Sequence, residues 1–246
     1  MDYRTRMYQA YVSTHFGYVG SLKPEEYKFL VPVYRKRFAP FLPKDKQAQI
    51  CDLACGSGHF LYFLQQEGYA NTCGIDISPE QVEQTQQMGV RNIVCGNILD
   101  FLKDKKETFD LISAHAIIAH FTKDELLTFF DLVYQALKPG GRFLVTTVNA
   151  SSLFGAGMIY MDFTHEISFT PGSLAQVYRV CGFRNFQVVG EKPEVYDLRS
   201  LVRRVLWEIV AFILKGYFKI EKGFGRGMWT HATSILEPRM IAIGEK

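Results

Sequence analysis

The stretch Ile50-Cys51-Asp52-Leu53-Ala54-Cys55-Gly56-Ser57-Gly58-His59-Phe60 decides the fold of this chain. An apolar run ends in a turn with two glycines, and the turn opens into a helical pattern. In open α/β sheets, nucleotides bind where a strand passes into a helix in this way. Asp76 closes the next apolar run, where a carboxylate can bind both hydroxyls of a ribose. Together these features predict a nucleotide-binding edge of a parallel sheet.

Outward from this stretch, short apolar runs alternate with longer helical patterns. The predicted strands cover residues 49–53, 72–75, 92–95, 109–113, 142–148, 185–189 and 239–244, and the predicted helices cover 58–67, 79–87, 123–137, 171–181 and 198–219. This alternation predicts an α/β fold with a Rossmann-like, seven-stranded, mostly parallel sheet and helices on both faces. We expect one domain over 1–246, with a helical segment at 1–45, a core at 46–190, and an amphipathic helix and last strand at 191–246.

The glycine pattern of the turn bears on which nucleotide binds. A dinucleotide site needs GxGxxG, and both reading frames fail at the third glycine, where His59 and Leu61 stand. Asp52 would repel a pyrophosphate, but it suits a ligand with an ammonium and a sulfonium, and S-adenosylmethionine carries both. Electrostatics therefore favour S-adenosylmethionine. The alternatives are an NAD-dependent oxidoreductase and a catalytically silent scaffold that binds S-adenosylmethionine.

Five motifs in chain order resemble those of class I S-adenosylmethionine-dependent methyltransferases. They are DLACGSG (52–58), GIDIS (74–78), CGNILDF (95–101), FDLISAHAIIAHF (109–121) and LKPGGRFLVTT (137–147). The resemblance covers residues 48–190. It implies that the turn holds the methionine part of the cofactor, through Asp52, Ala54, Cys55, Gly56 and Gly58. It also implies that Asp76 binds the ribose, Ile77 packs on the adenine, Asn97 and the backbone of Ile98 address the adenine edge, and His115 lies beside the methionyl group.

The chain departs from this family pattern at two positions. Ala54 replaces the usual first glycine of the turn, and Asn97 replaces a common Asp. Ala54 adds only a methyl group. The carbonyl oxygen of Asn97 can still accept a hydrogen bond from an exocyclic amine. We therefore expect cofactor binding to survive both changes.

A hydroxyl acceptor needs a base that removes its proton. The segment from Asp162 to Glu166 concentrates two carboxylates and a histidine after the fifth predicted strand. His165, oriented by Asp162, is our first candidate for the catalytic base, and His120 is the second. The alternative is that this segment is a hydrogen-bonded loop that caps the next helix and has no catalytic role. We expect no metal site, because no HxxxH, HExxH or zinc-like cysteine pair occurs. The alternative is a divalent ion bound by Asp162, His165 and Glu166.

A narrower resemblance concerns the nature of the acceptor. DFTHEISFTPGSL (162–174) and GYANTCGIDISPEQVEQ (68–84) resemble methyltransferases associated with bacterial surface-polysaccharide synthesis. This resemblance implies O-methylation of a sugar or glycan intermediate. That group usually has Glu where this chain has Ala119, which puts an acid–base role for the pair of Ala119 and His120 in doubt.

Positive charge gathers in the two flanking segments. Residues 1–45 hold eight Lys or Arg against four Asp or Glu, and residues 197–227 hold seven against three. Tyr3, Tyr8, Tyr11, Phe16 and Tyr18 suggest a lid over the cofactor, with a helix pair that completes the core as the alternative. The apolar face of 198–219 has three candidate partners: the sheet or lid of the chain itself, a second subunit in a homodimer, or the inner face of a membrane.

Other compositional features narrow the function classes. The chain has 246 residues and five cysteines without a CxxC pair, which indicates free thiols in a reducing compartment. We see no signal peptide and expect a cytoplasmic protein. Basic runs are too short to suggest nucleic acid as a partner. A small-molecule or glycan acceptor is the expected substrate.

Overall fold

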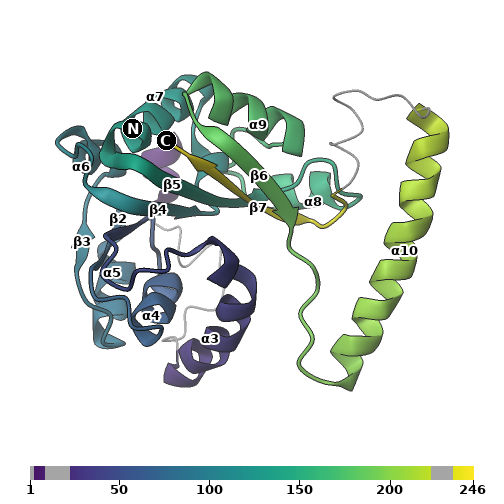
Figure 1. Cartoon of the computed structure of the whole chain (residues 1–246), viewed down its shortest axis with the longest axis horizontal. Coiled ribbons are helices and arrows are strands. Elements are labelled where there is room, and N and C mark those ends of the chain that lie inside the picture. Colours follow the sequence, from purple (N-terminus) through teal and green to yellow (C-terminus); the bar gives the residue numbers. More distant parts are fainter. Residues whose placement is uncertain (1–2, 9–22, 223–234) are drawn as a thin grey trace.

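In a computed structural model of the chain, the described residues are 3–8, 23–222 and 235–246. Within these ranges, seven strands form one sheet in the order β3-β2-β1-β4-β5-β7-β6 (Figure 1). The strands are β1 (Ile50–Leu53), β2 (Thr72–Asp76), β3 (Ile93–Cys95), β4 (Phe109–His115), β5 (Leu137–Val148), β6 (Arg184–Gly190) and β7 (Arg239–Glu245). Strands β1 to β5 run parallel, and β7 is antiparallel to β5 and β6. The predicted mostly parallel sheet is confirmed.

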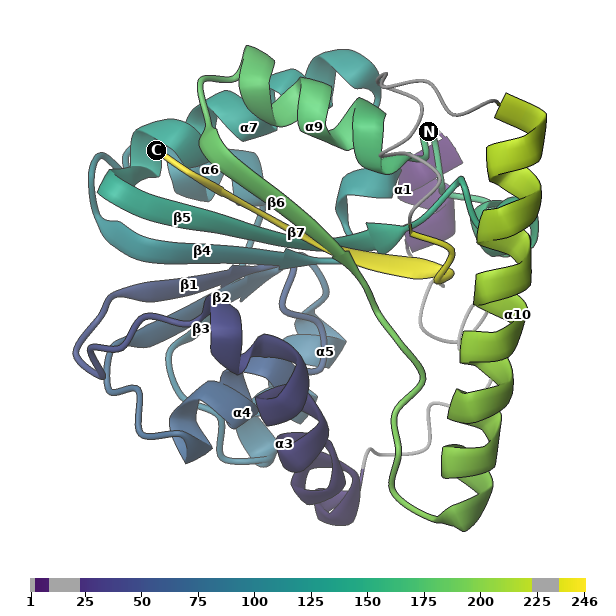
Figure 2. The same ribbon diagram turned by 45° about the vertical axis from the view of Figure 1, so that its right-hand side comes forward.

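Helices cover both faces of the sheet (Figure 2). One face carries α3 (Pro24–Phe38), α4 (His59–Gln66) and α5 (Pro79–Gln87), and the other carries α6 (Ile98–Lys103), α7 (Lys123–Ala136) and α9 (Pro171–Val180). Each face has its own buried cluster, with Phe60 and Phe63 in the first and Phe130 and Tyr178 in the second. Burial of each such side chain contributes about 1.5–3 kcal/mol. The helices are therefore held by two separate apolar layers.

The order of the strands places a crevice between β1 and β4. The chain continues from β1 to β2 on one side, and β4 starts the other half of the sheet. In open α/β sheets, ligands bind outside the carboxyl ends of the strands at this switch point. Asp52 pairs with Ser113 in register, and His115 follows at the end of β4. Both predicted cofactor residues, Asp52 and His115, thus belong to the two strands that border the crevice.

The boundaries of some elements differ from the prediction. Strand β5 starts at Leu137 rather than at 142, and it includes the Lys-Pro-Gly-Gly turn. Gly140 takes a φ of +76°, and the pairing of β4 with β5 shifts register in this region. Helices α6 and α8 (Gly155–Tyr160) were not predicted, because six residues are too few to show a helical period.

The N-terminal segment is helical where it is described. It contains α1 (Tyr3–Tyr8), α3 and the short 3₁₀ helix η1 (Ala39–Phe41). Tyr11, Phe16 and Tyr18 lie outside the described residues, as does the side chain of Tyr8. The lid over the cofactor therefore stays a prediction.

Helix α10 (Leu198–Lys222) is the amphipathic helix predicted before the last strand. It lies along one edge of the molecule (Figures 1 and 2). Of the three candidate partners for its apolar face, the sheet of the chain itself does not cover it, because Leu206, Ile213 and Ile220 are 57%, 62% and 81% exposed. Among the described helices, none combines the length and apolar character that a membrane crossing needs.

Candidate active site

The turn between β1 and α4 has a left-handed backbone. The φ angles of Ala54, Gly56 and Gly58 are 52°, 52° and 70°. A Cβ on Gly58 would lie 2.1 Å from Cγ2 of Thr85, so both space and conformation require glycine there. Ala54 holds the same conformation at a strain of roughly 1–2 kcal/mol. Such strain concentrates where a backbone is shaped for a ligand.

Asp76 fixes the turn to the end of β2. Its Oδ2 accepts the Gly56 N–H at 2.7 Å and its Oδ1 accepts the Ser78 N–H at 2.9 Å. Burial raises the pKa of this carboxyl above its ordinary value. The next residue, Ile77, is 59% exposed although it is a large aliphatic side chain. A carboxylate beside an exposed apolar side chain fits a ribose with an adenine packed next to it.

Asp52 and His115 form a buried polar pair at the switch point. Oδ1 of Asp52 accepts the Ser113 hydroxyl at 2.7 Å, and Nε2 of His115 lies 3.8 Å from the same oxygen. Burial raises the pKa of Asp52 to about 7 and lowers that of His115 to about 3. Within the described residues, His115 Nε2 is buried without a hydrogen-bond partner. Buried polar atoms of this kind are normally satisfied, so the pair fits a polar, cationic ligand.

Asn97 does not have the role that the sequence suggested. Its side-chain oxygen caps α6 by accepting the N–H groups of Leu99 and Asp100 at 2.8 and 3.3 Å. The group left for a ligand is the amide NH₂, which donates and therefore cannot accept from an exocyclic amine. Ile98 opens α6, and its N–H is one of the donors that a helix start leaves unsatisfied. The predicted role of the Ile98 backbone toward adenine stays a prediction.

Cys55 supports the turn from inside the fold. Its N–H donates to the carbonyl of Ile75 at 3.0 Å, and burial raises the pKa of its thiol well above the ordinary value. A buried, protonated thiol is unreactive. The contribution of Cys55 to a ligand site is therefore through the path of the backbone.

Helix α3 covers the start of α4. The hydroxyl of the buried Tyr27 donates to the carbonyl of Ser57, and its ring centroid lies 4.4 Å from that of His59. These contacts tie α3 to the glycine turn and to the first residue of α4. The described N-terminal helix α3 thus stabilises the cofactor turn itself.

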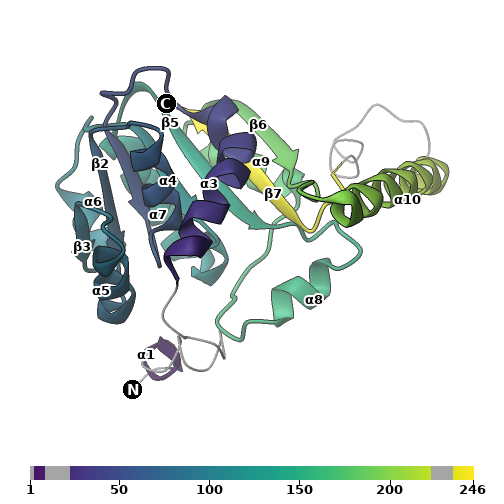
Figure 3. The same cartoon turned by 90° about the horizontal axis from the view of Figure 1, so that it is seen from below.

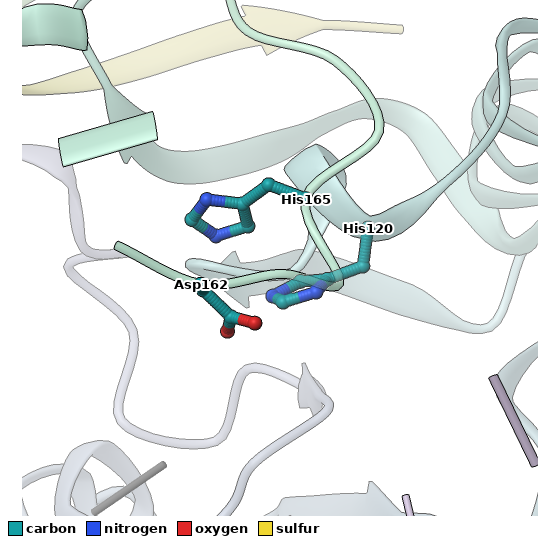
Figure 4. A group of neighbouring side chains, drawn as sticks. All are labelled: His120, Asp162 and His165. Carbon is teal, nitrogen blue, oxygen red and sulfur yellow. The ribbon is translucent and has the colours of Figure 1, made fainter. Parts of the chain in front are cut away.

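His120, Asp162 and His165 come together in the structure (Figure 4). His120 ends the 3₁₀ helix η2 (Ile118–His120), and the other two lie in the loop after α8. One potential ligand atom from each residue lies within 4.8 Å of the others, and the two imidazole centroids are 4.7 Å apart. All three predicted catalytic residues therefore form one cluster.

The hydrogen bond that orients His165 was not predicted. Its Nδ1 lies 2.8 Å from the carbonyl oxygen of Ile159. A carbonyl only accepts, so Nδ1 carries the proton and Nε2 of the neutral ring keeps its lone pair. The expected orienting carboxylate of Asp162 instead accepts the hydroxyl and the N–H of Thr164, at 2.7 and 2.9 Å. The residue type of Ile159 gives no signal for this contact, because the acceptor is a backbone atom.

Thr164 connects Asp162 to His120. Its hydroxyl donates to the Asp162 carboxylate, so its oxygen accepts from Nδ1 of His120 at 2.9 Å. Burial lowers the pKa of His120 to about 4, and the neighbouring His165 contributes to the same shift. His120 is therefore neutral at pH 7. Sequence reasoning missed Thr164, although it stands between two of the predicted residues.

The loop of His165 is tied to the 3₁₀ helix η2, which carries His120. The N–H groups of Glu166 and Ile167 both donate to the carbonyl of Ala119, at 2.8 and 3.2 Å. Arg4 of α1 forms ion pairs with Glu125 at 2.7 Å and Glu166 at 3.4 Å. Helix α1 thus docks beside the histidine cluster. This is the part of the predicted lid that the described residues include.

The same cluster has the composition of a metal site. Two imidazoles and one carboxylate are suitable ligands for a divalent transition metal. The predicted absence of a metal rested on sequence spacing, and that prediction stays untested. The geometry supports two chemical roles for the cluster, proton transfer and metal binding.

The fold and the turn define a Rossmann-like nucleotide-binding protein with the sheet of S-adenosylmethionine-dependent methyltransferases. A family described as "Methyltransferase domain" matches residues 27–205, and the chain belongs to this family. A SAM-dependent methyltransferase from Archaeoglobus fulgidus superimposes over 100% of both chains with a TM-score of 0.67 and 19% identity. These comparisons support S-adenosylmethionine as the cofactor.

Curated relatives add a more specific likeness. The chain is 28% identical over 123 residues to the mitochondrial ubiquinone biosynthesis O-methyltransferase of Bos taurus, covering 46% of this chain and 32% of the relative. It is 28% identical over 169 residues to the ubiquinone biosynthesis O-methyltransferase of Xylella fastidiosa strain 9a5c, covering 62% and 68%. The chain thus spans about a third of the length of the mitochondrial relative.

Proposed function

We propose that this protein is an S-adenosylmethionine-dependent O-methyltransferase that acts on a hydroxyl of a small molecule. The observation that carries the proposal is the prepared base, His165, whose Nδ1–H is held by the Ile159 carbonyl and whose Nε2 is left to accept a proton. His115 ends β4, and His120 follows five residues later in η2. The proposed base cluster and the proposed cofactor turn would therefore lie at the same end of the sheet.

The residues of the turn fit the cofactor by charge and by shape. When bound, S-adenosylmethionine supplies a methyl group on a positively charged sulfur. Asp52 and the unpartnered His115 Nε2 would face its methionine part, and Asp76 with Ile77 would bind the ribose and the adenine. The left-handed turn of Ala54, Gly56 and Gly58 brings backbone close to this ligand.

On the acceptor side, methyl transfer needs a hydroxyl that is aligned with the methyl group and that loses its proton. His165 would take that proton on Nε2. His120, neutral and fixed through Thr164 to Asp162, would lie beside the same hydroxyl and stays the second candidate for the base. The low pKa of His120 makes it a weaker base than an ordinary imidazole. The hydrogen bond that holds Nδ1 of His165 supports His165 as the first candidate.

For the acceptor we propose a hydroxylated small molecule, with a sugar or glycan intermediate as the first class to test. The motif at 162–174 supports this class through its resemblance to methyltransferases associated with polysaccharide synthesis. The names of the curated relatives support a hydroxyl as the methylated group. The whole chain, 1–246, would act as one domain in the cytoplasm.

The test is methyl transfer from labelled S-adenosylmethionine to a panel of nucleotide sugars, glycans and phenols. We expect His165→Ala to lower kcat by about 100-fold or more, because a positioned base contributes at least that much. Affinity for S-adenosylhomocysteine should stay within about twofold, and Met161→Ala, an exposed change in the same loop, should leave kcat unaltered.

An unchanged kcat in His165→Ala would remove His165 from the mechanism. A chelator separates proton transfer from metal binding. If activity is lost on chelation and restored by a divalent ion, the cluster of His120, Asp162 and His165 is a metal site and not a base. We expect the chelated enzyme to remain active.

A further inference from the structure

Helix α10 is attached to the rest of the protein along one narrow side. Ser200 and Ala211 are buried on that side. Trp207 lines a groove there together with Phe154, Pro193 and Pro238. The attachment uses residues from one helical stripe, so most of the helix circumference faces away from the sheet.

The outward side of α10 is apolar along its whole length. Eight large aliphatic or aromatic side chains there are more than half exposed, namely Leu198, Val202, Val205, Leu206, Ile209, Phe212, Ile213 and Ile220. At 3.6 residues per turn they fall within an arc of about 120°. No Lys, Arg, Asp or Glu of 198–222 falls inside this arc. An exposed apolar surface of this extent marks an interaction site.

Positive charge borders this apolar arc on both sides. Between 198 and 222 the helix holds six Lys or Arg and two Glu. Glu208 is neutralised by ion pairs to Lys192 and Arg204, each at 3.0 Å. Within the described residues, Arg199 and Lys219 make no ion pair, so cationic groups stay available at both edges. A wide apolar face with basic borders is typical of a helix that lies in a membrane interface.

Helix α8 adds further exposed rings beside the groove that α10 lines. Figure 3 shows α8 next to α10, below the sheet and away from its helical layers. Phe154, which precedes α8, shares the groove of Trp207 and is 67% exposed, and Tyr160 at the end of α8 is 86% exposed. Ile159 of the same helix accepts the hydrogen bond that orients His165. A surface bound to α8 and α10 would therefore lie next to the proposed acceptor site.

We infer that α10, together with α8, is a docking surface for an anionic phospholipid bilayer. The helix would lie in the plane of the interface over its length of about 37 Å, with the apolar arc inserted and the basic borders among the headgroups. The basic residues beside the apolar arc argue against a second copy of this chain as the binding partner of α10. Pairing the same face of two chains would bring the basic borders of both helices together, and like charges oppose that contact.

The experiment is co-sedimentation of the full chain with vesicles of phosphatidylcholine alone or mixed with phosphatidylglycerol. We expect binding to the anionic vesicles and much weaker binding to the neutral ones. Ile213→Glu should raise the half-saturating lipid concentration about tenfold or more, because it places a charge in the inserted face. Arg199→Glu with Lys219→Glu should weaken binding to anionic vesicles by a similar factor.

Val180→Glu is the matched control for Ile213→Glu. Val180 is an aliphatic residue on α9 that is 71% exposed, against 62% for Ile213, so both changes are tolerated at the surface. Its vesicle binding should equal that of the unaltered chain. Binding is measured without cofactor, so the outcome is independent of the proposed methyl transfer.

Two results would overturn the inference. One is no binding of the unaltered chain to anionic vesicles, and the other is equal binding by Ile213→Glu. Sedimentation velocity identifies the alternative occupant. A dimer that Ile213→Glu converts to a monomer, with no vesicle binding, would assign the face to a second copy.

Discussion

At the scale of single residues, the site depends on groups whose burial opposes their charged forms. Asp52 is buried and accepts the Ser113 hydroxyl, and His115 is partly buried, with its Nε2 atom buried and unpartnered within the described residues. At pH 7 in the protein alone, His115 is neutral and Asp52 is about half protonated, because desolvation disfavours charge. A cationic ligand changes this balance at Asp52, since an ammonium favours the carboxylate.

The affinity for S-adenosylmethionine should therefore depend on pH. Below the pKa of Asp52, about 7, the free protein holds a proton that binding must release. Affinity should fall by up to about tenfold per pH unit from 7 down to 5, and it should level off just above 7. Calorimetric titration at a series of pH values measures this. Asp52→Asn should bind more weakly at pH 7.5 and show a flat profile over the acid range.

A flat acid profile in the unaltered chain would place the ammonium group away from Asp52. The groups that face this carboxyl are Ser113, His115 and, through its charge, Asp76. Asp76→Asn therefore serves as a second variant. It should lower affinity at every pH while it preserves the slope that Asp52 produces.

At the scale of elements, the long pieces of the fold were predictable and the short ones were not. The runs that became β1, β2 and β4 are buried on both sides, and a continuous apolar run is a strong signal. Helices α6 and α8 have six residues each and show no period. The Ile159 carbonyl that orients His165 belongs to α8. Because this acceptor is a backbone atom in a helix that was not predicted, the amino-acid sequence could not indicate the hydrogen bond.

The function of α10 was predictable only in part, for a different reason. Its amphipathic pattern predicted a helix correctly, but the same pattern describes packing on a sheet, a second subunit or a membrane. The structure decides against the first, because the apolar arc faces outward. A periodic pattern indicates that a face needs a partner, and the tertiary structure identifies which side the partner lies on.

Helix α6 provides a test of how adenine is recognised. Asn97 uses its oxygen to cap the helix, so Asn97→Asp would keep one oxygen on the cap and offer the second to the exocyclic amine. One added hydrogen bond of about 1 kcal/mol should raise the affinity for S-adenosylhomocysteine about fivefold. Asn97→Ser keeps a capping oxygen without the second acceptor, and it should give no gain. A lower affinity in Asn97→Asp would mean that adenine is not bound at this helix.

At the scale of the whole molecule, the buried carboxylates and the basic residues lie in different parts of the fold. The cofactor turn lies at the centre of the sheet and depends on buried carboxylates, Asp52 and Asp76. The basic residues gather in the segments outside this core, where α1 docks beside the histidine cluster and α10 presents its apolar arc. In the proposed function, the central sheet would bind the cofactor and the flanking helices would form the acceptor side of the molecule.

The central claim is that the turn at 52–58 binds S-adenosylmethionine, and calorimetric titration of the full chain tests it most directly. We predict saturable binding of S-adenosylhomocysteine at micromolar concentrations, no binding of NADH, and loss of the S-adenosylhomocysteine signal in Asp76→Ala. Binding of NADH without binding of S-adenosylhomocysteine would contradict the assignment of both the cofactor and the reaction.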